Sequence, residues 1–174
     1  MGSKLLSGLP PIETAATRLL ILGSMPGQES LNRQRYYAHP RNSFWFIMAG
    51  LISLEEGSGY EERLNSLRQH GISLWDVLDN CVRPGSLDSD IVATTERAND
   101  LKGFQQRHPE LEAIAFNGRK ARHSFTRHLL HHDEKTWQKL TLIDLPSTSP
   151  AHAALRPAEK FMLWQKSLAP FITP

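Results

Sequence analysis

A short apolar run that ends in a turn is the feature that most restricts the fold of this chain. Residues 18–23 read Arg-Leu-Leu-Ile-Leu-Gly and lead directly into the turn sequence Ser-Met-Pro-Gly. A run of this length between turn residues is typical of a strand buried on both faces, as found in helix-covered parallel sheets. Similar runs follow at residues 72–78, 111–116 and 140–145. The pattern predicts four strands.

Helical patterns separate these four runs. The sequence predicts helices over 44–54, 61–69 and 90–106, another starting near 119, and a last one over 157–168 with Pro157 in its first turn. Strands that alternate with helices indicate a three-layer α/β/α fold around a mainly parallel four-stranded sheet. Residues 1–17, which contain two glycines and two prolines, are predicted to be an irregular lead-in to one domain over 18–174.

The charge of the chain is basic locally rather than overall. The formal net charge is +2, and two stretches, 30–50 and 116–132, contain basic residues and no acidic ones. Such patches permit contact with nucleic acid, although ordinary solvated helix faces have the same composition. The basic residues are Arg33, Arg35, Arg41, Arg119, Lys120, Arg122 and Arg127.

Cysteine usage and hydropathy indicate the cellular compartment. Cys81 is the only cysteine, so the chain can form no intramolecular disulfide, and a reducing compartment fits. No apolar run approaches the roughly 18 residues of a membrane span, and the N-terminus does not resemble a secretory signal. We therefore expect a cytoplasmic protein with no membrane partner, associated with the nucleoid if the source is bacterial.

Polar and aromatic residues follow the ends of three predicted strands. They occur at 23–28, at Asn117-Gly118 and at 146–152, and the carboxyl ends of parallel strands form binding sites at one edge of a sheet. Segment 36–45, Tyr-Tyr-Ala-His-Pro-Arg-Asn-Ser-Phe-Trp, adds aromatic, imidazole, guanidinium and amide groups. Backbone donors, a stacking surface and polar side chains should therefore converge in one pocket, which is suited to holding a nucleobase.

These motifs resemble those of the uracil-DNA glycosylase superfamily. Its mismatch-specific branch has a Gly-x-x-Pro-Gly turn before an Ala-His-Pro-x-Asn-x-Phe-Trp segment, as residues 23–27 and 38–45 have here, and segments 71–84, 116–119 and 145–152 are also similar. That branch positions the attacking water with an Asn where this chain has Met25, whose thioether cannot activate water. The pattern with Met25 resembles the hypoxanthine-DNA (deoxyinosine) glycosylase family, in which a later Asn is catalytic; the matching residue is Asn42.

The resemblance implies a monofunctional DNA glycosylase of base-excision repair. Such an enzyme hydrolyses the N-glycosidic bond of a deaminated base, here hypoxanthine first, and leaves an abasic site. It needs no metal or other cofactor, and its partner is DNA that contains the deaminated base; we expect a monomer. Asn42 would position water and stabilise charge on the sugar, with capping of the following helix as the alternative role. No lysine is placed to form a Schiff base.

The resemblance also assigns the other site residues. The predicted base-binding residues are Ser24, Met25, Pro26, Gly27, Gln28, Tyr37, His39, Asp76 and Asn80. Tyr37 would stack on the base, whereas Tyr36, Phe44 and Trp45 are expected to be packing residues. The predicted DNA-binding residues are Asn117, Gly118, Arg119, Lys120, Ser147, Thr148, Ser149, Ala151 and His152.

The segment over residues 146–152 is predicted to press on the DNA backbone. Its two prolines make residues 146–152 a stiff loop with Ala151 and His152 as the tip that enters the minor groove. Leu145 stands where some superfamily members have a histidine near the leaving base. His152 is either a partial replacement or an ordinary surface histidine.

Other functions remain open at this stage. A uracil-DNA or mismatch-specific glycosylase of the same fold is the nearest alternative, and a catalytically silent nucleic-acid-binding protein is the second, because Met25 and Leu145 replace two functional groups. An enzyme of mononucleotide metabolism fits the fold class but lacks a glycine-rich phosphate loop. His128 and His132 are one helical turn apart, yet no glutamate or cysteine completes a zinc motif, so we predict no metal site.

Overall fold

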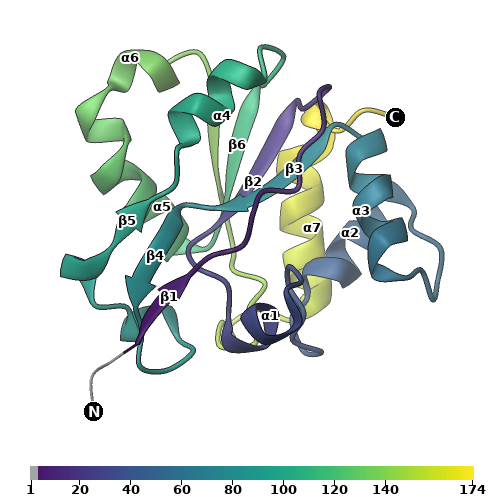
Figure 1. Ribbon diagram of the computed structural model, residues 1–174. Coiled ribbons are helices and arrows are strands. Elements are labelled where there is room, and N and C mark those ends of the chain that lie inside the picture. Colours follow the sequence, from purple (N-terminus) through teal and green to yellow (C-terminus); the bar gives the residue numbers. More distant parts are fainter. Residues whose placement is uncertain (1–3) are drawn as a thin grey trace.

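The computed structural model describes residues 4–174 and is built on a four-stranded parallel sheet (Figure 1). The strands lie in the order β3-β2-β6-β7, so the first strand of this sheet in the chain, β2, is central. Each neighbouring pair is parallel, and Gly23 at the end of β2 lies opposite Asp76 at the end of β3. The strands are β2 (Leu19–Gly23), β3 (Ile72–Asp76), β6 (Ala113–Asn117) and β7 (Thr141–Leu145).

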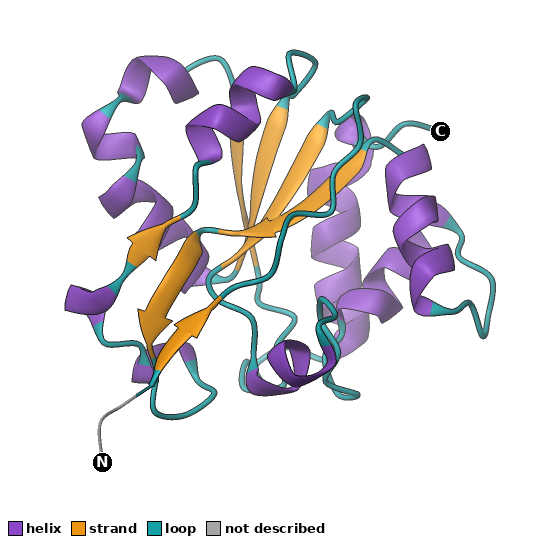
Figure 2. Ribbon diagram, viewed as in Figure 1, coloured by secondary structure: helices purple, strands orange, loops and turns teal. Residues whose placement is uncertain are grey.

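Helices cover both faces of this sheet, which confirms the predicted three-layer α/β/α fold (Figure 2). One face packs against α2 (Phe44–Ile52), α3 (Tyr60–Gln69) and α7 (Pro157–Leu168). The other packs against α4 (Leu101–Arg107), α5 (Arg119–His128) and α6 (Glu134–Trp137). The short helix α1 (Gln28–Arg33) follows the turn after β2.

The central strand divides the core into two clusters. Side chains alternate across a strand, so Leu19 and Ile21 join the α2, α3 and α7 cluster, while Leu20 and Leu22 join the cluster on the other face. All five residues of β2 are buried, as the continuous apolar run predicts. Burial on both faces fixes the end of β2, and the turn that follows it, firmly in the molecule.

A second, antiparallel sheet was not predicted. It consists of β1 (Leu5–Ser7), β4 (Leu78–Val82) and β5 (Arg97–Ala98), with β4 in the middle. The interpretation of residues 1–17 as irregular was therefore wrong for β1, while residues 1–3 lie outside the described part. The predicted strand 72–78 is also two strands, because the chain leaves the main sheet at Val77 and enters the second sheet at Leu78.

The predicted helix over 90–106 was wrong over its first half. Residues 88–90 and 93–95 form single 3₁₀ turns, β5 follows, and α4 begins only after Asp100, whose side chain caps it by accepting a hydrogen bond from Gly103 N–H. Val92, Thr94 and Thr95 lower helix propensity, and the Thr95 hydroxyl instead accepts a hydrogen bond from Val82 N–H in β4.

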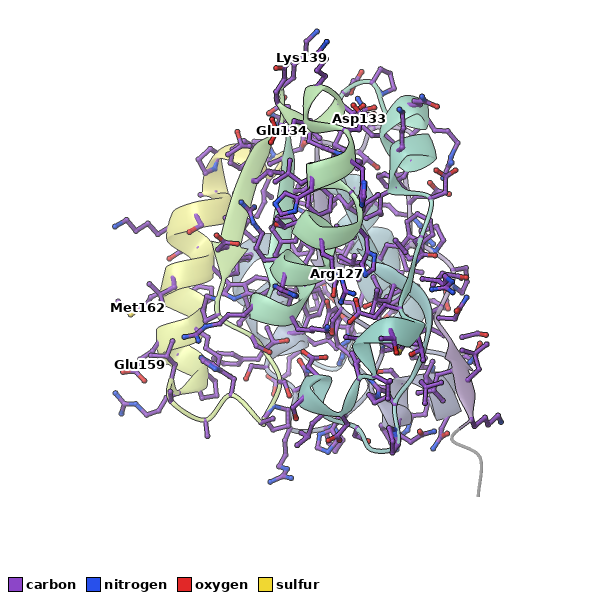
Figure 3. The ribbon with its side chains drawn as sticks, turned by 90° about the vertical axis from the view of Figure 1, so that its left-hand side faces the viewer. Arg127, Asp133, Glu134, Lys139, Glu159 and Met162 are labelled. Atoms are coloured by element: carbon purple, nitrogen blue, oxygen red, sulfur yellow. The ribbon has the colours of Figure 1, made fainter. Side chains whose placement is uncertain are left out.

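The outer surfaces of the helices are polar. Glu134, Lys139 and Glu159 point outward from the protein, and Met162 on α7 is among the few large apolar side chains that do so (Figure 3). None of the helices in residues 4–174 combines the length and the hydropathy that crossing a membrane requires.

Candidate active site

One large pocket opens at the carboxyl ends of the parallel strands. Its volume is about 1270 Å³, and its walls come from the turn after β2, the segment before α2, the ends of β3, β6 and β7, and the loops after β4 and β7. Every predicted site residue except Asn80 lines it. Asn80 lies outside the pocket in β4, where its amide donates to Asp79 and its backbone pairs with β1.

Asn42 lies in the segment that enters α2. Its Oδ1 accepts a hydrogen bond of 2.9 Å from Phe44 N–H, and its own N–H donates to His39 O. The amide therefore has the helix-entry role that the sequence left open as an alternative. It also lines the pocket, and Oδ1 keeps a second lone pair while the NH₂ group keeps its donors. The bond from Phe44 N–H holds the side chain in place and leaves one Oδ1 lone pair and both amide hydrogens available.

Asp76 and Tyr37 meet over Gly23 at the floor of the pocket. A Cβ atom at Gly23 would lie 2.5 Å from Asp76 Oδ1 and 3.6 Å from the Tyr37 hydroxyl oxygen, so both side chains use the space that glycine leaves. Asp76 Oδ2 and the Tyr37 hydroxyl are buried and have no hydrogen-bond partner within residues 4–174. Buried polar atoms without partners are rare, and here two of them face one cavity.

Burial controls the protonation of both groups. It raises the pKa of Asp76 to about 8, with a further increase from nearby Asp88 and a partial decrease from Arg83. The Asp76 carboxyl is therefore mostly protonated at neutral pH and has a hydrogen to donate. Burial also raises the pKa of the Tyr37 hydroxyl, with a smaller contribution from Asp76, so it too remains a donor.

Tyr37 is held in an unusual backbone conformation. Its φ is +54°, in the left-handed region that non-glycine residues seldom occupy. The ring stacks on Phe44, with a centroid distance of 3.8 Å and an interplanar angle of 18°. Phe44 thus covers one face of the Tyr37 ring, and the rest of the Tyr37 side chain lines the pocket. Tyr36, Phe44 and Trp45 are packing residues as predicted, since Tyr36 and Phe44 are buried and Trp45 is half-buried.

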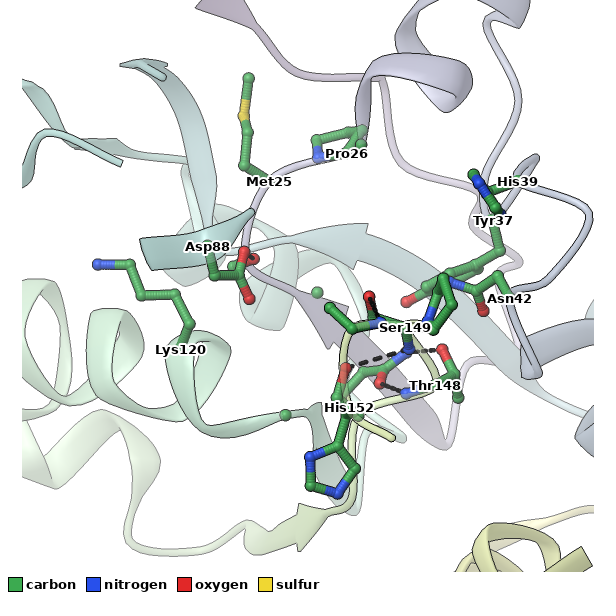
Figure 4. Close-up of a pocket in the computed structure, with 18 of the residues that line it drawn as sticks. Met25, Pro26, Tyr37, His39, Asn42, Asp88, Lys120, Thr148, Ser149 and His152 are labelled. Atoms are coloured by element: carbon green, nitrogen blue, oxygen red, sulfur yellow. Dashed lines mark hydrogen bonds between the residues drawn. The ribbon is translucent and has the colours of Figure 1, made fainter. Parts of the chain in front are cut away.

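The turn after β2 forms one wall of the pocket through its backbone. The Met25 side chain is buried in the core cluster below α4 and α5, and it points away from Asn42 and Ser149 (Figure 4). Arg83, also buried, donates from Nη2 to Pro26 O at 2.7 Å and from Nη1 to Met25 O. This arginine therefore fixes the turn that residues 24–28 form.

The loop over residues 146–152 is tied to the pocket by a latch between Asn117 and Thr148. Asn117 Nδ2 donates to Thr148 Oγ1, and Asn117 Oδ1 accepts from Thr148 N–H, both at 2.9 Å. Thr148 O accepts from Ser43 N–H, next to Asn42. Trp164 Nε1 donates to Pro146 O, and Lys160 Nζ donates to Ser149 O. The loop is thereby positioned before any ligand binds.

The exposed part of this loop presents hydroxyl groups and a small tip. Ser147 Oγ accepts from Ser149 N–H and Ser149 Oγ accepts from Ala151 N–H, which leaves each hydroxyl hydrogen free to donate to a ligand. Ala151 is exposed and His152 is half-exposed. Gly118, at φ +95°, allows the loop to approach, because a Cβ there would lie 3.0 Å from Ser147 Cβ.

Comparison with known proteins identifies the family of this chain. The uracil DNA glycosylase superfamily model matches residues 10–169, which is nearly the whole chain. The chain belongs to the uracil-DNA glycosylase superfamily. As a member it is a DNA glycosylase, a hydrolase that acts on N-glycosidic bonds in DNA.

Two relatives of this glycosylase come from species of Methanosarcina. It is 41% identical over 115 residues to a protein of Methanosarcina acetivorans named hypoxanthine DNA glycosylase, covering 66% of this chain and 72% of that one. A protein of Methanosarcina barkeri with the same name is 36% identical over the same shares. A solution NMR structure of a candidate uracil DNA glycosylase from M. acetivorans superposes with a TM-score of 0.76, at 34% identity, over 94% of this chain and 98% of that one.

Three of the predicted DNA-binding residues also form contacts within the protein. Asn117 and Thr148 are buried, and their side chains are hydrogen-bonded to each other. Lys120 forms an ion pair with the buried carboxylate of Glu96, which also accepts a hydrogen bond of 2.6 Å from His128 Nε2. Burial alone would raise the pKa of Glu96, but the bonds from Lys120 and His128 outweigh it and lower the pKa.

Several pocket residues were not predicted from the sequence. They lie in the loop after β4, where Asp88 accepts a hydrogen bond from Ser24 Oγ. Arg83, which holds the turn after β2 without lining the pocket, was also missed. The segment Arg-Pro-Gly-Ser after a predicted strand could have marked a loop at the site edge, because loops at the carboxyl ends of strands carry function.

His128 was considered as a metal ligand; within residues 4–174 no group of three or more side chains that could hold a metal ion occurs.

Proposed function

We propose that this glycosylase removes hypoxanthine from DNA. The names of the two Methanosarcina relatives and the motif with Met25 and Asn42 support this substrate. Hypoxanthine arises when adenine is deaminated. The enzyme would remove it and leave an abasic deoxyribose, on which later repair steps act.

The pair of unpartnered polar atoms at the pocket floor carries this proposal. Hypoxanthine presents an N1–H donor beside an O6 acceptor. A protonated Asp76 offers a donor and an acceptor to such an edge, and the Tyr37 hydroxyl offers another donor. A donor on O6 also favours the negative charge that develops on the departing base. The turn at residues 24–28 would hold the base from one side.

The proposed reaction needs one water molecule and no cofactor. The bond between C1′ of the deoxyribose and N9 of the base breaks, and the water oxygen forms the new bond to C1′. Asn42 would accept a water hydrogen at Oδ1 and orient the oxygen toward C1′, since an amide is too weak a base to remove the proton outright. The proton released from water balances the charge on the departing base.

In this proposal, residues on the rim of the pocket bind the DNA backbone. We assign phosphate contacts to the Ser147 and Ser149 hydroxyls, to Arg41 and to Arg119, all of which line the pocket, with Arg41 and Arg119 exposed. We further propose that the protein acts as a monomer in a reducing cytoplasm, without a membrane partner, consistent with its single buried cysteine.

A single-turnover excision panel tests the substrate. Labelled duplexes and single strands would carry hypoxanthine, uracil, xanthine, or thymine opposite guanine. We expect release of hypoxanthine. Uracil is the second candidate, because its N3–H and O4 present the same donor and acceptor pair to Asp76; release of uracil alone would replace the proposed substrate, and release of no base would contradict the proposal.

The variant Asn42→Ala tests the proposed role of the amide. We expect excision to slow by about 10²-fold or more, the scale of losing one preorganised polar group from an active site. Asn65→Ala on α3, an exposed site away from the pocket, is the matched control and should leave the rate unchanged. Unfolding curves of both variants separate a lost helix cap from a lost catalytic group. A wild-type rate for Asn42→Ala would refute the assignment.

A further inference from the structure

Leu87 is a large apolar side chain that remains in water at the mouth of the pocket. It is 50% exposed, and it lies in the loop after β4, which lines the same pocket as the predicted DNA-contacting loop at 146–152. Among the large hydrophobic residues exposed in the described part of the chain, Leu87 alone lines the pocket. The others lie elsewhere and are Leu5, Phe46, Val92, Met162 and Leu163.

The backbone around Leu87 is fixed although its side chain is free. Leu87 N–H donates to Asp90 Oδ2 at 3.2 Å, and Leu87 O accepts from Asp90 N–H at 3.0 Å. The adjacent Asp88 accepts from Ser24 Oγ in the turn after β2. Arg83 joins the same turn to the beginning of the loop, because it donates both to Pro26 O and to Gly85 O. Leu87 is therefore held at a set position relative to the base pocket.

The other rim of the pocket lacks a side chain of this kind. The predicted tip of the 146–152 loop consists of Ala151, whose methyl group is too small to replace a base in a duplex, and His152, whose imidazole is polar rather than apolar. Extruding a base leaves a gap between its neighbours and costs a few kcal/mol of stacking and pairing, and inserted apolar side chains such as Leu offset such costs. An exposed Leu on a fixed loop meets this requirement, whereas an Ala does not.

We infer that Leu87 is the wedge that enters the duplex and fills the space left by the extruded base. The inference rests on the proposed glycosylase function. It assigns base extrusion to the loop after β4, with the 146–152 loop holding the backbone. Leu87 is on this account a positioning residue: it stabilises the extruded state and does not touch the reacting bond.

Comparison of paired and unpaired substrates tests this role. Hypoxanthine would be presented in a duplex opposite thymine, in a bulge, and in the same strand alone, under single-turnover conditions. We expect Leu87→Ala to slow excision from the duplex at least about tenfold, to slow excision from the bulge less, and to leave the single strand at the wild-type rate, because only the paired base must be unstacked.

A control variant and two contrary results complete the test of the wedge assignment. Val92→Ala truncates another exposed apolar side chain, 40% exposed, that lies outside the pocket, and it should leave all three rates unchanged. If Leu87→Ala slows duplex and single strand alike, or slows neither, the wedge assignment is wrong while the glycosylase function stands. If the wild-type protein releases no hypoxanthine even from single strands, the proposed function itself has failed and the inference fails with it.

Discussion

Gly23 and Asp76 show how two residues far apart in sequence form one functional unit. They end neighbouring parallel strands and lie in register, and the missing side chain of Gly23 gives the Asp76 carboxyl its place. The sequence indicated each residue separately, through the turn motif and through the resemblance. It could not indicate that burial leaves Asp76 without a partner, because that depends on Tyr37 and the surrounding core.

The protonation of Asp76 leads to a prediction on stability. The pKa of this carboxyl is about 8 in the folded protein against an ordinary value of 3.8, so between these pH values the unfolded chain ionises while the folded chain does not. The free energy of unfolding therefore falls as pH rises through this window. Asp76→Asn should remove this dependence and be more stable at pH 7 by at least about 1 kcal/mol.

Denaturant unfolding from pH 4 to pH 9 measures this effect. The advantage of Asp76→Asn should grow up to about pH 8 and then stay constant. Asp79→Asn, a change of the same chemistry at an exposed position, is the control. In wild type, hypoxanthine excision should also decline above about pH 8 as the donor is lost. Parallel stability profiles for wild type and Asp76→Asn would show that the carboxyl is ionised in the folded state.

At the scale of elements, the buried strands of the parallel sheet were predictable, whereas the strands of the second sheet were not. The runs at 18–23, 111–116 and 140–145 match β2, β6 and β7 to within two residues at every end, because burial imposes continuous apolar sequence. In the second sheet, β1 and β5 have only three and two residues, too few to show a period. β4 has five residues, as the main-sheet strands have, but it contains Asp79 and Asn80 and is only partly buried, so it lacks a continuous apolar run. The same reasoning explains the site: residues that follow the apolar strands were found, and those in the loop after β4 were missed.

The latch between β6 and the 146–152 loop leads to a prediction at this scale. Thr148→Val keeps the shape of the side chain but removes the acceptor for Asn117 Nδ2, which leaves a buried donor unpaired. We expect a loss of about 1–3 kcal/mol in the free energy of unfolding, measured with urea. Thr94→Val makes the same chemical change at an exposed residue and should have little effect on stability. Equal stabilities for both variants would mean that the latch does not hold the loop.

At the scale of the whole molecule, the position of charge matters more than its sum. The net charge of +2 is too small for binding DNA by overall attraction, and several basic side chains are already paired, including Lys120 with Glu96 and Arg33 with Glu29. Arg41 and Arg119 remain as exposed cations that line the pocket. The sequence identified the two basic stretches but could not separate paired from available charges, since the partners Glu96 and Glu29 lie outside those stretches.

The salt dependence of DNA binding tests this view, because each phosphate that is neutralised releases counterions. Arg119→Gln should weaken binding and make the slope of log K against log salt less steep by about 0.9 for duplex DNA. Lys139→Gln changes the net charge by the same amount, but Lys139 precedes β7 at the end of the sheet away from the pocket and points outward (Figure 3). Its slope should equal that of wild type. If both variants change the slope equally, the protein attracts DNA through its total charge, and the pocket rim has no special part in binding.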